Sequence, residues 1–113
     1  MTAPAEFVLR READGTIALC GELDAAGVPS LRARLQVLAG SAAVCRLELA
    51  TLDLLDAGAV IGMLEAVRSL VSGGADVTLV HAPQTLAHTL YRVGALGQPG
   101  LFLVEPREEE PYA

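Results

Sequence analysis

The chain has 113 residues, a formal net charge of −6 at pH 7 and a sequence pI of about 4.7. Its length and its hydrophobic fraction of 52% predict one domain over residues 1–113, with a core over about residues 7–104 that needs no disulfide or metal. The acidic balance and an aromatic content of 4% argue against nucleic-acid binding, which needs clustered basic residues and stacking aromatic rings.

The longest apolar run, over residues 60–71, is interrupted by charged and polar side chains, so it does not predict a membrane span. Residues 1–6 lack the charged and apolar regions of a signal peptide. We therefore expect a cytoplasmic protein that does not insert directly into a membrane. In that compartment Cys20 and Cys45, whose spacing fits no metal motif, are expected to be reduced core thiols.

Two short strands are expected at the start of the chain, over Phe7–Arg11 and Thr16–Gly21. The dipeptide Asp14-Gly15 between them is typical of a hairpin turn. The chain is therefore predicted to open with an antiparallel hairpin.

The first helix is expected to begin near Gly27 or Val28, because Pro29 is tolerated in the first turn of a helix but is costly further inside it. Asp24 is then left in the loop that leaves the second strand. The apolar face of this helix is expected to hold Val28, Leu31, Leu35 and Leu38.

The middle of the chain predicts a strand over Val44–Leu49, where apolar and polar residues alternate, followed by a loop over residues 51–55. From Ala57 the pattern becomes helical, and Gly73-Gly74 is typical of a helix end. The apolar face of this second helix is expected to hold Val60, Ile61, Leu64, Val67 and Val71.

The last third of the chain predicts a strand over residues 76–82 and a helix that Pro83 opens and Gly94 ends. The inward residues of that helix are expected to be Leu86, Leu90 and Val93. A short strand over Leu101–Val104 follows, and residues 105–113 are expected to be a loose acidic tail.

The expected order of elements is β-β-α-β-α-β-α-β. Strands separated by helices imply right-handed crossovers and parallel pairing, and the opening hairpin adds one antiparallel edge strand. This predicts an α/β fold, a mixed sheet with an N-terminal antiparallel hairpin. The clear alternation over residues 44–49 favours helices packed mainly on one face of the sheet.

Residues that could support catalysis are few. The glycines near residues 58–62 match no phosphate-binding fingerprint, and no serine nucleophile motif accompanies His81 or His88. Asp53 and Asp56 lie in one expected loop, without an identifiable partner acid. We therefore expect no enzyme activity, no metal and no cofactor.

Three segments together resemble the STAS domain family, which includes bacterial anti-sigma factor antagonists and the cytoplasmic tails of sulfate transporters. They are "GELDAAGVPSLRARL", "LELATLDLLDAGAVIGML" and "VTLVHAPQTLAHTLYRVGAL". The resemblance runs from about Phe7 to Val104, and its most specific parts are residues 21–24, 47–49 and 54–56. It implies the STAS fold, in agreement with the order of elements read from the pattern.

In antagonists of this family the segment that begins at Asp56 reads Asp-Ser-Ser/Thr-Gly, and its second hydroxyl residue is phosphorylated by an anti-sigma factor that is also a kinase. The resemblance places Ala57 at the first Ser, Gly58 at the phospho-acceptor and Ala59 at the Gly. Phosphate abolishes binding to that partner in the family. Gly58 has no oxygen to accept a phosphoryl group, so this switch is absent at its usual position.

The residues that remain predict a docking face at a helix N-terminus. Asp56 is expected to cap the helix, and Ala57, Gly58 and Ala59 are small enough for a partner's backbone to come close. The resemblance adds Asp24, which matches an acid near the acceptor on the partner surface. Thr51, the nearest upstream hydroxyl, is an alternative acceptor or simply a turn residue.

The resemblance leaves three functions open. The chain is expected to bind an anti-sigma factor with serine kinase activity or a related regulator, as a stand-alone STAS protein. Alternatively it is an accessory subunit that docks on the ATPase of an ABC transporter of the phospholipid-trafficking type. A third reading is a sensor of nucleotides or other small molecules, since helix N-termini suit anions. A homodimer is left open.

Overall fold

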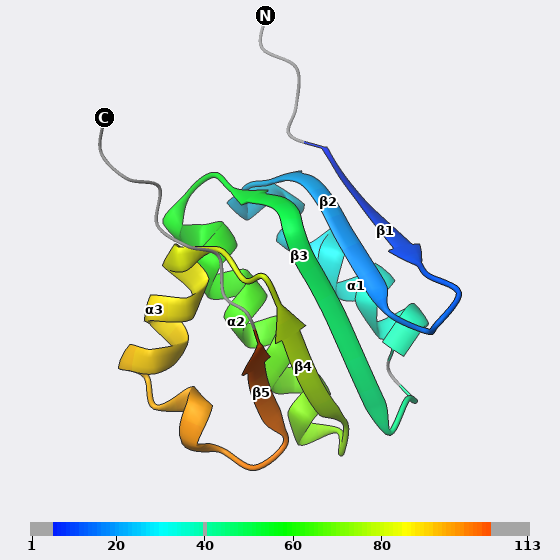
Figure 1. The fold of residues 1–113 in the computed structure, drawn as a ribbon. Helices are drawn as coiled ribbons and strands as arrows, with labels where there is room; N and C mark the ends of the chain where they lie inside the picture. The colour runs from blue at the N-terminus through cyan, green and yellow to red at the C-terminus, as the bar shows by residue number, and fades with distance from the viewer. Residues whose placement is uncertain (1–5, 40, 105–113) are drawn as a thin grey trace, which may run out of the picture.

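The computed structural model describes residues 6–39 and 41–104. It contains one five-stranded sheet with the order β1-β2-β3-β4-β5, in which β1 is antiparallel to β2 and all other neighbours are parallel (Figure 1). In chain order the elements are β1 (Phe7–Arg11), β2 (Ile17–Leu23), the 3₁₀ turn η1 (Ala25–Gly27), α1 (Val28–Ala39), β3 (Val44–Leu54), α2 (Ala57–Ser72), β4 (Asp76–Val80), α3 (Gln84–Arg92), the 3₁₀ turn η2 (Ala95–Gly97) and β5 (Leu101–Val104).

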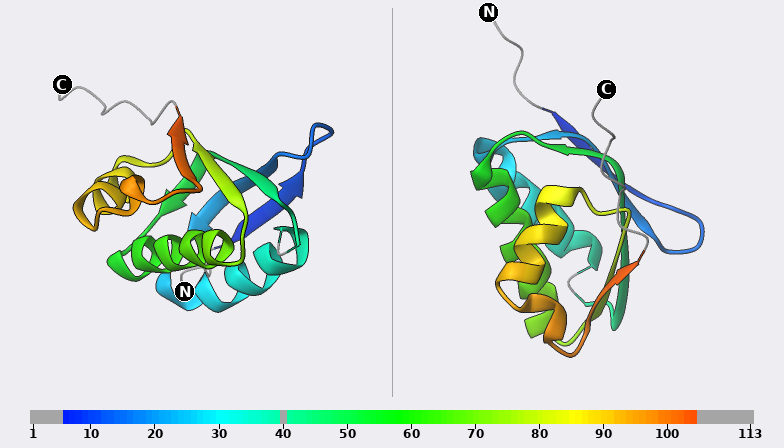
Figure 2. Two further views of the ribbon diagram at one scale, coloured as in Figure 1. Left: turned by 90° about the horizontal axis from the view of Figure 1, so that it is seen from below. Right: turned by 60° about the vertical axis from the view of Figure 1, so that its left-hand side comes forward.

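The three α-helices cover one face of the sheet, as Figure 2 shows most clearly in its right-hand view. The core lies between these two layers. Cys45, Leu47 and Leu49 of β3 point into it, and α1 contributes Leu31 and Leu35. The predicted mixed sheet, with an antiparallel hairpin and helices on one side, is therefore confirmed.

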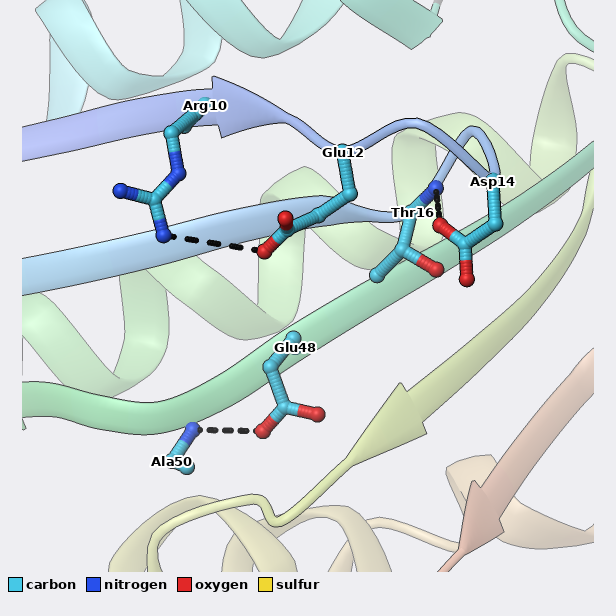
Figure 3. A network of polar contacts seen from close by, with 6 residues as sticks. All are labelled: Arg10, Glu12, Asp14, Thr16, Glu48 and Ala50. Carbon is cyan, nitrogen blue, oxygen red and sulfur yellow. Dashed lines mark hydrogen bonds and ion pairs between the residues drawn. The ribbon is translucent and has the colours of Figure 1, made fainter.

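The β1–β2 hairpin is formed by local hydrogen bonds around Asp14-Gly15 (Figure 3). The Asp14 carboxylate accepts a hydrogen bond from the Thr16 backbone N–H at 2.9 Å, and Gly15 takes the positive φ of +90° that the turn needs. The hydrogen bond from the Thr16 backbone lowers the pKa of Asp14 below its usual value. The second strand begins at Ile17 and runs two residues beyond the predicted end, to Leu23.

Strand β3 corrects the prediction that residues 51–55 form a loop, because the strand continues to Leu54. Ala18 of β2 pairs with Glu48 of β3, and Cys20 of β2 pairs with Thr51 of β3. Between these two pairs β3 therefore has one residue more than β2, which is a β-bulge. This bulge shifts the side-chain alternation by one residue. The interrupted alternation made the second half of the strand look like a loop.

Two helix faces also differ from the prediction. Ile61 is 52% exposed and Val93 is 49% exposed, although both were expected to point inward. The buried residues of α2 include both small and large side chains, and Gly62 among them lies against Val28 of α1. These buried residues are Ala59, Gly62, Met63, Leu64, Ala66, Val67 and Leu70.

The remaining element bounds agree closely with the expected ones. Helix α1 begins at Val28, α2 ends just before Gly73, and α3 begins just after Pro83. Strand β4 ends at Val80 instead of Ala82, because His81 adopts a left-handed backbone with φ of +56°. The expected stop at Gly94 is confirmed by its left-handed φ of +73°.

No helix within the described part of the chain is long and apolar enough to span a membrane. The acidic tail over residues 105–113 and the N-terminal residues 1–5 lie outside the described residues. The expectations of a loose tail and of no signal peptide thus stay predictions.

Candidate functional site

The predicted site lies at the edge of the sheet where the parallel strands β2 and β3 both end (Figure 1). Strand β2 leads into η1, and β3 leads into α2. Leu23 pairs with Leu54, and the Leu55 N–H donates to the Leu23 carbonyl at 2.9 Å. Residues 24–27 and 55–59, far apart in the sequence, are thereby held side by side.

Asp24 begins the first of these segments and caps its 3₁₀ turn. Its carboxylate accepts a hydrogen bond from the Gly27 N–H at 2.9 Å, and its backbone is extended, with φ −114° and ψ 176°. Asp24 is half-buried. Asp24 therefore lies in the predicted loop and shapes that loop directly.

Asp56 links the two segments through both oxygens of its carboxylate. Oδ1 accepts from the Ala59 N–H at 2.8 Å, which makes Asp56 the N-cap of α2 as predicted. Oδ2 accepts from the Ala25 N–H at 3.2 Å, a bond that the sequence did not predict. One exposed side chain thus fixes the start of α2 and its position relative to η1.

Gly58 is in close contact with η1. A Cβ built at Gly58 would lie 2.5 Å from the Cβ of Ala25, closer than such atoms approach in proteins. One turn later, a Cβ at Gly62 would lie 2.4 Å from a methyl carbon of Val28. Neither glycine is in the left-handed region, so both are required by close packing and not by backbone conformation.

The Ala25 methyl occupies the space that a side chain at residue 58 would need. The assignment of Gly58 to the family's phospho-acceptor position stays a prediction. The predicted docking residues also differ in accessibility. Asp56 and Ala57 are exposed, Asp24 and Gly58 are half-buried, and Ala59 is fully buried. Ala59 thus cannot offer its side chain to a partner from this conformation.

Two polar residues that precede Asp56 in the chain, Thr51 and Asp53, lie on strand β3 and not at the N-terminus of α2. Thr51 is exposed and pairs with Cys20, and Asp53 pairs with Glu22. The expectation that Thr51 is a loop residue and that Asp53 shares a loop with Asp56 is therefore wrong. The bulge in β3 is the physical reason for both errors.

The remaining candidates are spread over the fold. Cys20 and Cys45 are free thiols, and burial raises the pKa of Cys45. His81 contacts Glu48, with 2.7 Å between Nδ1 and Oε1, whereas His88 lies on α3. No group of three His, Cys, Asp or Glu side chains suited to a metal ion occurs in residues 6–39 and 41–104.

A groove beside the docking residues was not predicted. It lies between the N-terminal half of α2 and helix α3, with a volume of about 890 Å³. Residues that line it include Leu55, Ile61, His88, Tyr91 and Arg92. The helical pattern predicts Ile61 in the core, whereas the structure exposes this side chain in the groove. An apolar residue was thus available in the sequence as a signal for the groove, but the pattern assigned it to the buried face.

The fold resembles those of several solved structures. The phosphorylated form of the Bacillus cell fate determinant SpoIIAA is 22% identical, with a TM-score of 0.61 over 87% of this chain and 90% of that chain. A putative anti-sigma factor antagonist from Thermotoga maritima is 14% identical, with a TM-score of 0.62 over 88% and 86%. An anti-sigma factor antagonist from Mycobacterium paratuberculosis is 15% identical, with a TM-score of 0.59 over 90% of each chain.

Comparison with curated protein sequences gave no significant match. The family model described as "Mlab, STAS domain" matches residues 7–105, which include every helix and strand of the structure. The predicted resemblance is thereby confirmed. The chain belongs to the STAS domain family.

Proposed function

We propose that this STAS domain is a regulatory protein-binding module, similar to an anti-sigma factor antagonist, that phosphorylation at residue 58 does not control. Its docking face consists of Asp24, Asp56, Ala57 and Gly58, and the buried Ala59 packs in the core beneath these residues. The proposal places the chain in the cytoplasm, with an anti-sigma factor that is a serine kinase, or a related regulator, as its partner.

The contact between Gly58 and Ala25 carries this proposal. Phosphoryl transfer needs an oxygen nucleophile in line with the γ-phosphate, and Gly58 offers none. The neighbouring segment occupies the space beside Gly58, with only 2.5 Å between the Ala25 Cβ and a Cβ built at residue 58. A hydroxyl side chain therefore fits only if η1 shifts, so the absence of an acceptor is part of how the two segments pack.

The hydrogen bonds of Asp56 support a rigid docking face. The carboxylate holds the Ala59 and Ala25 N–H groups at 2.8 Å and 3.2 Å, so η1 and the start of α2 form one unit. A surface that is already ordered loses less conformational entropy when a partner binds. Such a surface suits constitutive binding, in which release depends on something other than phosphate on this chain.

A pull-down from the native host tests the docking face. Ala57→Arg puts a long cation on the exposed start of α2, and the matched control Ala33→Arg makes the same change on the exposed side of α1. We expect the first variant to lose a partner that the wild-type chain and Ala33→Arg both retain. Retention of every partner by Ala57→Arg would refute the docking face.

The proposed lack of a phosphorylation switch has its own test. The captured kinase is incubated with the chain and ATP, and tryptic peptides are measured by mass spectrometry. We expect no phosphate on peptides covering residues 47–64, a range that includes Thr51 as well as Gly58. A phosphopeptide from this range would contradict the proposal.

A second candidate is an accessory subunit that docks on the ATPase of an ABC transporter. The absence of an acceptor at Gly58 favours it, because such a subunit needs lasting contact and no phosphate-controlled release. The same pull-down separates the two candidates. A transporter ATPase lost on Ala57→Arg supports the accessory subunit, and a serine kinase lost on that variant supports the antagonist.

A further inference from the structure

The groove between α2 and α3 exposes apolar side chains that a folded domain normally buries. Of the eight large hydrophobic side chains that are exposed among the described residues, three line this groove: Leu55 at 50%, Ile61 at 52% and Tyr91 at 78%. A cluster of exposed apolar residues in a concave surface is typical of a protein-binding site. Its volume of about 890 Å³ accommodates several side chains.

The charges at the groove differ from those of the whole chain, which has a formal net charge of −6. Helix α3 supplies Arg92 and His88 to the groove and contains no acidic residue. Within the part of the chain that the structure describes, the one acid that lines the groove is Asp56, and its two oxygens already accept backbone N–H groups. Among residues 6–39 and 41–104, no ion pair engages Arg92. A carboxylate on a partner would therefore find an available cation here.

The groove is also continuous with the proposed docking face, because Asp56 and Ala57 belong to both. Its walls are two helices that lie side by side (Figure 2). A third helix can pack into such a groove, with anchors spaced at i, i+3 or i+4, and i+7. We propose that this groove receives an amphipathic helix of the protein partner, with apolar anchors over Leu55 and Ile61 and a carboxylate beside Arg92; this rests on the proposed docking function.

The test uses two synthetic helical peptides as probes. Both carry leucine at i, i+3 and i+7, and they differ only in having Glu or Lys at the flanking positions. Each is titrated into the ¹⁵N-labelled full chain. We expect the Glu peptide to bind at least 10-fold more tightly than the Lys peptide and to shift the amide signals of Leu55, Ile61 and Tyr91.

Charge variants show whether Arg92 causes this preference. Arg92→Glu should weaken the Glu peptide at least 10-fold and reverse the preference toward the Lys peptide, which a simple loss of folding cannot do. The matched control Arg68→Glu changes an exposed arginine of α2 outside the groove and should leave both affinities unchanged within about 2-fold. Equal affinities for the two peptides, or equal losses in both variants, would overturn the proposal.

Two other occupants would also overturn it. If Glu108, Glu109 and Glu110 are replaced together by Gln and the Glu peptide then binds more tightly, the chain's own tail competes for the groove. If sedimentation velocity shows a dimer that Ile61→Glu dissociates, a second copy fills it. A partner that is lost on Ala57→Arg while both peptides fail to bind leaves the docking face intact and refutes only the groove.

Discussion

Residue 58 is restricted to glycine by its contact with Ala25 of η1, and not by the conformation of helix α2. Glycine lowers helix stability by about 1 kcal/mol relative to alanine, so its position in the first turn of α2 needs a reason. The reason is Ala25, whose Cβ would lie 2.5 Å from any Cβ at residue 58. Restoring a hydroxyl at this position therefore involves both segments.

Gly58→Ser is expected to destabilise the fold by about 1–3 kcal/mol, as overpacking of a close contact does. Ala25→Gly in the same chain removes the clashing methyl and should recover at least about 1 kcal/mol of that loss. The free energy of unfolding in urea, measured for the wild type, both single variants and the double variant, gives the coupling energy. Additive effects of the two substitutions would show that the predicted contact is absent.

Asp56 gives a second prediction for a single residue. Asp56→Ala removes the acceptor for the Ala59 and Ala25 N–H groups and should cost about 1–2 kcal/mol. Asp56→Asn keeps one acceptor oxygen, so it should lose only part of that free energy. Urea unfolding of both variants is compared with Asp53→Ala, an exposed β3 carboxylate expected to change stability by no more than about 0.5 kcal/mol.

The sequence predicted the Asp56 cap of this site but not the contact between Ala25 and Gly58. An acid followed by three small residues is a local signal for a capped helix start, so Asp56 was assigned correctly. The Ala25–Gly58 contact joins segments that only the sheet brings together, and no local pattern reports it. The burial of Ala59 was missed because the apolar face of α2 was placed too far toward Ile61.

Helix α2 is fitted to its neighbours by two glycines one turn apart. Gly62 is buried, and a Cβ built there would lie 2.4 Å from one Val28 methyl carbon and 2.6 Å from the other. Gly62→Ala should therefore cost about 1–3 kcal/mol, although alanine is the better helix former by about 1 kcal/mol. Urea unfolding measures the loss.

Another glycine of the same region provides the control for this prediction. At Gly73, at the C-cap of α2, a built Cβ has its nearest contacts at 3.5 Å, an ordinary van der Waals distance. Gly73→Ala should change stability by no more than about 0.5 kcal/mol. Val28→Ala combined with Gly62→Ala should recover part of the lost stability. Equal effects at the two glycines would contradict the packing argument.

The β1–β2 hairpin predicts a pH effect through Asp14. The Thr16 backbone N–H stabilises the ionised carboxylate and lowers the pKa of Asp14 in the folded chain. A lowered folded-state pKa contributes stability above the unfolded pKa, and that contribution is lost as pH falls through the folded value. Asp14→Asn keeps the turn and an acceptor oxygen but has no charge.

We expect the Asp14→Asn chain to have a lower Tm than the wild type at pH 7. The difference should shrink below about pH 4 and disappear below the folded pKa of Asp14. Thermal unfolding across this range measures it, with Asp53→Asn as the control for general charge effects. A Tm difference that stays constant with pH would refute a contribution from the carboxylate charge.

At the level of elements, the sequence was most reliable where glycine and proline mark the ends. Pro29, Pro83 and Gly94 placed helix boundaries correctly because their backbone restrictions act locally. The second half of β3 was missed because a bulge interrupts the local alternation, and only the pairing with the partner strand distinguishes a bulge from the end of a strand. The same dependence on neighbours explains the exposed Ile61, which the helical period alone places inward.

At the level of the whole molecule, stability is distributed unevenly across the sheet. Strand β3 is central, pairs with β2 and β4, and buries Leu47, Leu49 and Leu52 completely. Strands β1 and β5 are the edges, and β1 has no fully buried residue. Edge strands with few buried contacts open without unfolding the rest, whereas a central strand opens only when the sheet is lost.

Native-state hydrogen exchange should therefore divide the sheet into two classes of amide. The Leu47 amide in β3 should exchange only through global unfolding, with a free energy equal to that from urea unfolding, whereas the β1 amides should exchange at lower free energies. Gly62→Ala destabilises the whole fold, so it should lower the opening free energy measured by exchange of the Leu47 amide by the full loss of stability measured in urea. It should leave the β1 amides nearly unchanged, because their opening does not require α2 to leave the sheet. If the β1 and β3 amides instead fall together by the same amount, the sheet unfolds as one cooperative unit and the edge hairpin is as stable as the centre.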